Sequence, residues 1–174
     1  VKMVDGVDKN IEDIVIGDKV KSWNKETNEI GESVVEKLTQ PIHDDMIVVD
    51  WSNGSNKNTF DHPYYVKGKG WGSYKPELTM KNYNIGEVKQ LEVGDIIYEY
   101  DNLKEVTINS IVEELGKVQT YIFTLDKDNT FFANNVLVHN KCFRANVKVL
   151  MEGGLLKNIE DVQIGEKLVG KDGS

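Results

Sequence analysis

Few side chains in this sequence can act as nucleophiles or carry protons near neutral pH. There is one cysteine, Cys142, and there are three histidines, His43, His62 and His139. A thiol attacks as its thiolate, and an imidazole with an unperturbed pKa of about 6.5 exchanges protons near neutrality. The spacing of these residues matches no metal site, and a lone thiol forms no internal disulfide. We therefore expect neither a metal nor a cofactor. The adjacent pair His139 and Asn140 is separated from Cys142 by Lys141 alone.

Length and charge limit the classes of function. The chain has 174 residues, enough for one compact domain and a short appendage. Twenty-nine acidic against 21 basic residues give a formal net charge of -8, which argues against a nucleic-acid partner. No apolar run approaches the roughly 18 residues of a membrane span, and the first residues do not form a signal peptide. We expect a soluble protein that binds neither nucleic acid nor membrane; its localisation is unknown.

Short strands and tight turns account for most of the chain. Several segments are rich in β-branched and aromatic residues, and their hydrophobic residues recur mostly at a period of two, as in strands. The clearest are residues 46–51, 95–100, 106–112 and 120–125. Turn-forming residues lie at 52–56, 67–70, 101–102 and 133–135. Residues 10–14 predict one helical turn and no segment predicts a long amphipathic helix, so the fold class is all-β.

The sequence also repeats itself. Residues 1–26 and 149–174 are identical at 11 of 26 positions, and the second copy carries seven extra residues, Cys142–Lys148, at its front. A fainter similarity relates residues 14–20 to residues 91–97, which indicates a fold of two related halves. We expect one domain over residues 1–140 and the start of a second copy over residues 141–174.

Four blocks in this order resemble the intein and Hint (hedgehog–intein) superfamily. They are residues 5–20, Thr59-Phe60-Asp61-His62-Pro63, residues 129–134 and Leu137-Val138-His139-Asn140. Together they span almost all of residues 1–140. The resemblance implies a Hint fold of two pseudo-symmetric halves with short strands and little helix. It also implies that residues 1–140 lack the opening strand that carries a cysteine. Cys142–Lys148 is the duplicate of that strand and could take its place, as in a circular permutation.

The resemblance implies autocatalytic processing in cis and five catalytic residues. An N–S acyl shift begins when a cysteine thiol attacks the preceding carbonyl, and Cys142 would be such a cysteine. His62 would protonate the leaving nitrogen, and Thr59 would hold the scissile amide and its oxygen. Asn140 would cyclise and break the Asn140–Lys141 bond, with His139 polarising the carbonyl.

The sequence departs from the family pattern at three positions. Asn129 and Ile122 occupy places where the family often has histidine and aspartate, so the cleavage after Asn140 should be slow. Asp126 or Asp128 could compensate, although we interpret both as solvated loop carboxylates. Lys141 replaces the Cys, Ser or Thr that accepts the migrating chain in splicing, and this favours cleavage of the ends over full splicing.

The partners implied are the flanking polypeptide segments (exteins) in cis, with strand exchange between copies as a further possibility. The second hypothesis is a non-catalytic Hint-fold structural or connecting module. A third is an unrelated ligand-binding β-barrel, in which His62, His139 and Asn140 would not converge. The segment between His62 and Phe131 is too short to hold an inserted endonuclease domain.

Overall fold

The computed structural model describes residues 1–140, 148–150 and 156–158. The chain divides into two compact units, Val1–Cys142 and Phe143–Ser174. In the second unit, β15 (Lys148–Leu150) pairs antiparallel with β16 (Leu156–Asn158). The expectation that residues 141–174 open a second copy falls mostly outside the described residues and stays a prediction.

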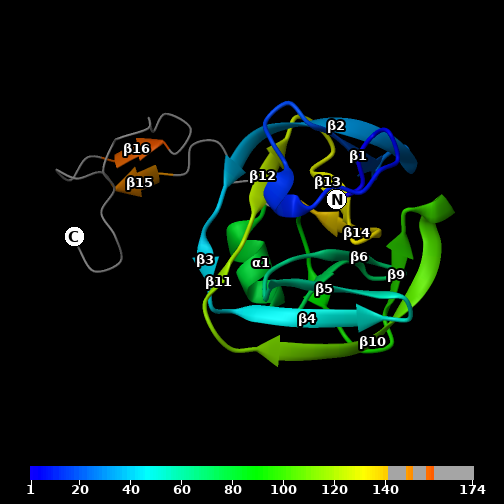
Figure 1. Cartoon of the computed structure of the whole chain (residues 1–174). Helices are drawn as coiled ribbons and strands as arrows, with labels where there is room; N and C mark the ends of the chain where they lie inside the picture. The colour runs from blue at the N-terminus through cyan, green and yellow to red at the C-terminus, as the bar shows by residue number, and fades with distance from the viewer. Residues whose placement is uncertain (141–147, 151–155, 159–174) are drawn as a thin grey trace. The chain divides into compact units, whose positions relative to one another are not determined.

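Strands are the main regular structure of the first unit, as the sequence predicts (Figure 1). Its strands are β1 (Lys19–Asn24), β2 (Glu29–Thr39), β3 (Ile42–His43), β4 (Met46–Trp51), β5 (Gly54–Thr59), β6 (Tyr64–Val66), β7 (Gly70–Ser73), β8 (Lys89–Gln90), β9 (Ile96–Glu99), β10 (Lys104–Glu114), β11 (Val118–Gln119), β12 (Ile122–Leu125), β13 (Thr130–Ala133) and β14 (Val136–His139). The helical segments are the 3-10 turns η1 (Ile11–Asp13) and η2 (Asp101–Leu103) and the helix α1 (Pro76–Asn82).

Two long strands organise the unit in the same way. The first half of β2 pairs with β1 and its second half pairs with β12. The first half of β10 pairs with β9 and its second half pairs with β4. Each long strand is therefore shared between two partners, and these two arrangements are the pseudo-symmetric halves of the Hint fold.

The turn before each half repeats in atomic detail. Asp18 and Asp95 each accept a backbone N–H from three residues earlier and an ammonium group, Lys9 to Asp18 and Lys69 to Asp95, both at 2.7 Å. The preceding glycines adopt nearly the same left-handed conformation, with φ of 93° at Gly17 and 94° at Gly94. The faint similarity between residues 14–20 and 91–97 thus reflects one turn used twice.

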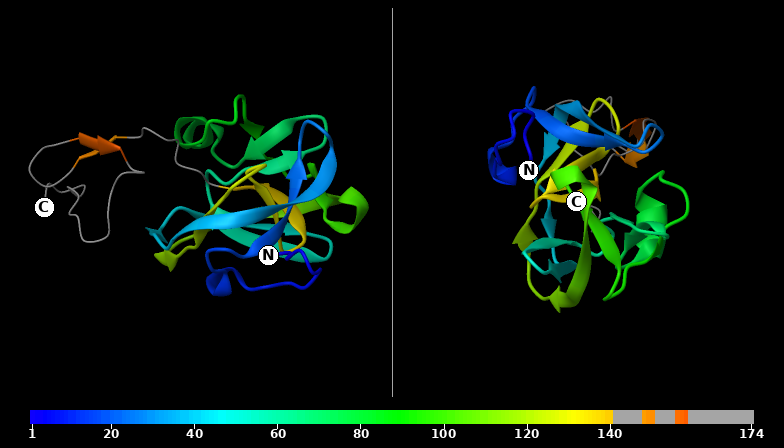
Figure 2. Two further views of the ribbon diagram at one scale, coloured as in Figure 1. Left: turned by 90° about the horizontal axis from the view of Figure 1, so that it is seen from above. Right: turned by 90° about the vertical axis from the view of Figure 1, so that its right-hand side faces the viewer.

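The β13–β14 hairpin lies between the two halves and carries the end of the unit. Its turn residues Asn134 and Asn135 both have positive φ, as a two-residue hairpin turn requires. β14 also pairs with β6 and β9, while β13 lies against β1. Viewed from above, the blue β1–β2 ribbon crosses over the yellow hairpin (Figure 2).

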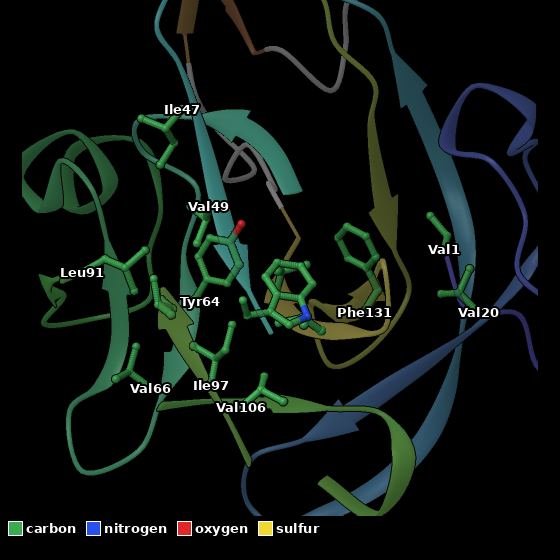
Figure 3. Packing of buried hydrophobic residues seen from close by; sticks show 14 of the residues in the cluster. Val1, Val20, Ile47, Val49, Tyr64, Val66, Leu91, Ile97, Val106 and Phe131 are labelled. Carbon is green, nitrogen blue, oxygen red and sulfur yellow. The ribbon is translucent and has the colours of Figure 1, made fainter. Parts of the chain in front are cut away.

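The larger of two hydrophobic clusters joins these elements. It includes fully buried side chains from both halves, among them Val20, Ile47, Tyr64 and Ile97. Figure 3 shows Phe131 of β13 facing Val1 and Val20 on one side and the cluster around Tyr64 on the other. The core therefore fixes the hairpin relative to both halves.

The structure corrects two details of the expected elements. Gly54–Asn56, expected within a turn, belong to β5, because pairing with β4 overrides their weak strand propensity. Helix α1 was not foreseen, although Pro76 at its first turn, Glu77 near its start and Lys81 near its end are ordinary helix signals.

Candidate functional site

The segment Thr59–His62 leaves β5 in a tight turn held by helix α1. The Asp61 carboxylate, 3% exposed, accepts hydrogen bonds from the Thr59 hydroxyl at 2.6 Å and from the Asn82 amide at 2.8 Å. The Thr79 hydroxyl donates to the Asp61 carbonyl at 2.9 Å. A buried carboxylate requires such donors, and here they fix the positions of Thr59 and His62. Neither Asp61 nor Asn82 was singled out from the sequence.

His139 and Asn140 end β14 beside that segment. The His139 N–H donates to the Pro63 carbonyl at 3.0 Å, which ties the last block directly to the Thr59–Pro63 block. The Asn140 N–H donates to the Asn129 carbonyl at 2.7 Å. Asn140 is only 2% exposed, so its conformation is set by the protein rather than by solvent.

The His139 ring points at the carbonyl of the next residue. Its Nδ1 lies 2.5 Å from the Asn140 carbonyl oxygen. Because a carbonyl oxygen only accepts, we assign the proton of the neutral imidazole to Nδ1. The ring is packed edge-on against Trp71 and Tyr83, with centroid distances of 4.9 and 5.9 Å. These aromatic contacts lock the ring orientation.

Burial makes this histidine neutral at physiological pH. His139 is 8% exposed, and its removal from water lowers the pKa to about 4, although the contact with Asn140 acts in the opposite direction. The imidazole is therefore a neutral hydrogen-bond donor at pH 7.

This pKa predicts a specific pH dependence of stability. His139 takes up a proton below about pH 6.5 when unfolded, but only below about pH 4 when folded. Between those values the unfolded state binds more protons, so the free energy of unfolding falls as the pH falls, by about 3 kcal/mol in total. Urea unfolding at several pH values should show this loss of stability. In His139→Gln the free energy of unfolding should fall less over the same pH range, because the contribution of His139 is absent. An equal slope in both proteins would contradict the burial of a neutral imidazole.

Thr59, His62 and Asn140 line one cavity of about 720 Å³. Val1 and Tyr83 lie in the same wall. Much of the remaining wall consists of primary amides, namely Asn10, Asn56, Asn58, Gln119, Asn134 and Asn135. Donor and acceptor groups of this kind suit the backbone of an extended peptide.

The five residues predicted to be catalytic are thus distributed as follows. Three of them, Thr59, His62 and Asn140, share the cavity wall. His139 lies behind Asn140 and contacts Tyr83 of the wall. Cys142 lies outside the described residues. The roles assigned to these residues remain predictions.

Asp126 and Asp128, which were considered as substitutes for the missing family residues, bind groups of β1 and β2. Asp126 accepts the Val34 N–H at 2.8 Å. Asp128 accepts hydrogen bonds from Ser22 at 3.2 Å and from Asn24 at 2.7 Å. All three hydrogen bonds come from residues of β1 and β2, so both carboxylates have a structural role.

The described residues include no group of three or more histidine, cysteine, aspartate or glutamate side chains that could hold a metal ion. Within the part of the chain that the structure describes, every helix is too short and too polar to cross a bilayer.

Sequence comparison connects the first part of the chain to one family. Residues 1–102 match the family model of the ataxin-1 and HBP1 module (AXH). "HMG box-containing protein 1" of Bos taurus is 32% identical over 75 residues, which cover 42% of this chain, and the human protein gives the same values. The match covers 13% of the length of these curated relatives.

Structural comparison covers more of the chain. The bacterial intein-like domain from Clostridium thermocellum aligns with a TM-score of 0.63 and 29% identity, covering 79% of this chain and 91% of that domain. The DnaB intein from Synechocystis sp. PCC 6803 aligns with a TM-score of 0.60 and 16% identity, over 82% of this chain and 94% of the intein. The DnaX mini intein from Spirulina platensis aligns with a TM-score of 0.60 and 20% identity, over 80% of this chain and 94% of the intein.

Proposed function

We propose that this chain, which belongs to the ataxin-1 and HBP1 module (AXH) family and is an intein-like Hint domain, cleaves its own backbone after Asn140. The observation that carries the proposal is the 2.5 Å contact between His139 Nδ1 and the carbonyl oxygen of Asn140. That carbonyl belongs to the bond to be broken, so a buried donor is aimed at the atom where negative charge develops.

The proposed reaction is intramolecular. The side-chain amide nitrogen of Asn140 attacks its own backbone carbonyl carbon, which forms a five-membered succinimide. The bond to the nitrogen of Lys141 breaks, and the proton lost by the amide passes to that nitrogen. His139 stabilises the oxyanion of the tetrahedral intermediate through its Nδ1–H, in a buried setting where such a hydrogen bond is strong.

The second proposed step is the N–S acyl shift at a cysteine. The thiol of Cys142 would attack the carbonyl of Lys141, form a thioester and release the Cys142 nitrogen as an amine. In the Hint pattern His62 supplies the proton to the leaving nitrogen and Thr59 fixes the amide. The Thr59 hydroxyl donates its proton to Asp61, so toward the N–H of a scissile amide its oxygen would act as a hydrogen-bond acceptor.

End cleavage fits this chain better than splicing. Lys141 carries neither hydroxyl nor thiol, so it cannot accept a migrating acyl group as Cys, Ser or Thr would. The partners of the reaction are the flanking polypeptide segments in cis.

Incubation of the purified chain tests the proposal. Intact-mass spectrometry over several days at 37 °C should show two products, residues 1–140 and 141–174. The larger product should be lighter by one water than the free acid, because it ends in a succinimide. A folded chain of unchanged mass would instead support the non-catalytic Hint-fold module.

A further inference from the structure

We infer that Asn129 is a positioning residue for the cyclisation of Asn140, and that it acts through its backbone carbonyl and left-handed conformation. The inference rests on the proposed function. It differs from the expectation that a side chain at this place takes part in the reaction.

The contact itself is between main chains. The Asn129 carbonyl accepts the Asn140 N–H at 2.7 Å. On the other side of the same residue, His139 contacts the Asn140 carbonyl at 2.5 Å. The peptide groups before and after Asn140 are therefore both held. Fewer torsions then remain to be fixed before the side-chain amide reaches the carbonyl carbon, and a restriction of this kind raises intramolecular rates.

The carbonyl is aimed by an unusual turn. Asp128 and Asn129 are consecutive residues with positive φ, 48° and 46°. Aspartate and asparagine tolerate this left-handed region better than other residues with a Cβ, and β-branched residues tolerate it worst. Residue 129 is exposed and lies outside the hydrophobic core, so a substitution there acts on the left-handed backbone conformation without disturbing core packing.

The turn is anchored to β1 on both sides of Asn129. Before it, the Asp128 carboxylate binds the side chains of Ser22 and Asn24. After it, the Thr130 hydroxyl accepts the Trp23 N–H at 2.8 Å and donates to the Trp23 carbonyl at 2.7 Å. These bonds join residues more than 100 positions apart, so β1 fixes the place from which Asn129 holds Asn140.

Two substitutions at the same position separate a backbone role from a side-chain role. Asn129→Gly removes the side chain and keeps the left-handed conformation accessible, so cleavage after Asn140 should stay within about 3-fold of the unmodified chain. Asn129→Val disfavours that conformation, and cleavage should slow by about 10-fold or more. Slow cleavage in Asn129→Gly, or unimpaired cleavage in Asn129→Val, would overturn the inference.

A matched control removes the general cost of the substitution. Asn102 is an exposed asparagine with φ of 50° in η2 and does not line the cavity. Asn102→Val carries the same conformational penalty and should cleave at the unmodified rate. If it slows cleavage as much as Asn129→Val does, the effect is a loss of stability and the inference fails.

Hydrogen exchange tests the positioning independently of cleavage. In NMR spectra the Asn140 amide should exchange slowly in the unmodified chain and in Asn129→Gly, and at least about 10-fold faster in Asn129→Val. If the unmodified chain does not cleave, the proposed function fails, and equal exchange rates in the three proteins would additionally overturn the positioning role.

Discussion

Replacing Asn140 by alanine should abolish scission between residues 140 and 141 while the domain stays folded. The substitution removes the carboxamide nitrogen that acts as nucleophile, and no neighbouring group can close the same five-membered ring. We expect the rate to fall at least about 1000-fold, to the background of peptide hydrolysis. Intact-mass spectrometry of both proteins under identical incubation measures this directly.

A second asparagine of the same cavity wall provides the control. Asn10 lines the cavity and binds Asp13 at the surface. Asn10→Ala should leave the rate within about 2-fold, because the Asn10 amide binds Asp13, whereas His139 and Asn129 hold the main chain of Asn140. Unchanged scission in Asn140→Ala would rule out the succinimide route, and circular dichroism establishes that the variant is folded.

Replacing His139 should give the second largest loss of rate. His139→Ala removes the hydrogen-bond donor to the Asn140 carbonyl, and a positioned donor of this kind contributes roughly 100-fold or more. His43 lies on β3 and its ring binds Asp45, so His43→Ala should have no such effect. Equal rates in His139→Ala and the unmodified chain would show that the buried ring is only structural.

The pH profile adds a signature that packing alone would not produce. Because the pKa of His139 is lowered to about 4, the imidazole keeps the same protonation state from about pH 5 to pH 8. The cleavage rate should therefore show no inflection near pH 6.5, where an exposed histidine titrates, and should change only as the pH approaches 4. An inflection near 6.5 that disappears in His139→Gln would contradict the buried, neutral donor.

Local sequence patterns were sufficient for the class of fold. A segment rich in β-branched and aromatic residues predicted β4 with the bounds Met46–Trp51, and the Asn134-Asn135 pair predicted the hairpin turn. Strand and turn preferences of this kind act over a few residues, so they can be read without knowing the neighbours in space. Helix α1 was missed because it is short, and its place depends on the buried Asp61 that it binds.

The sequence by itself determined which residues could carry the chemistry and their order along the chain. The blocks around Thr59, His62 and Asn140 are local motifs. The sequence of the turn around Asp18 is similar to that of the turn around Asp95. Such features depend on residue type and spacing alone, and they identified an intein-like domain.

Only the tertiary structure decided how those residues are held. The lowered pKa of His139 follows from burial against Trp71 and Tyr83, and the grip on Asn140 comes from the carbonyl of Asn129. Burial and backbone hydrogen bonds between distant segments arise when the whole chain packs, and a backbone carbonyl is the same in every residue type. Local sequence patterns therefore cannot predict the direction of such a carbonyl, or which imidazole will be buried away from solvent.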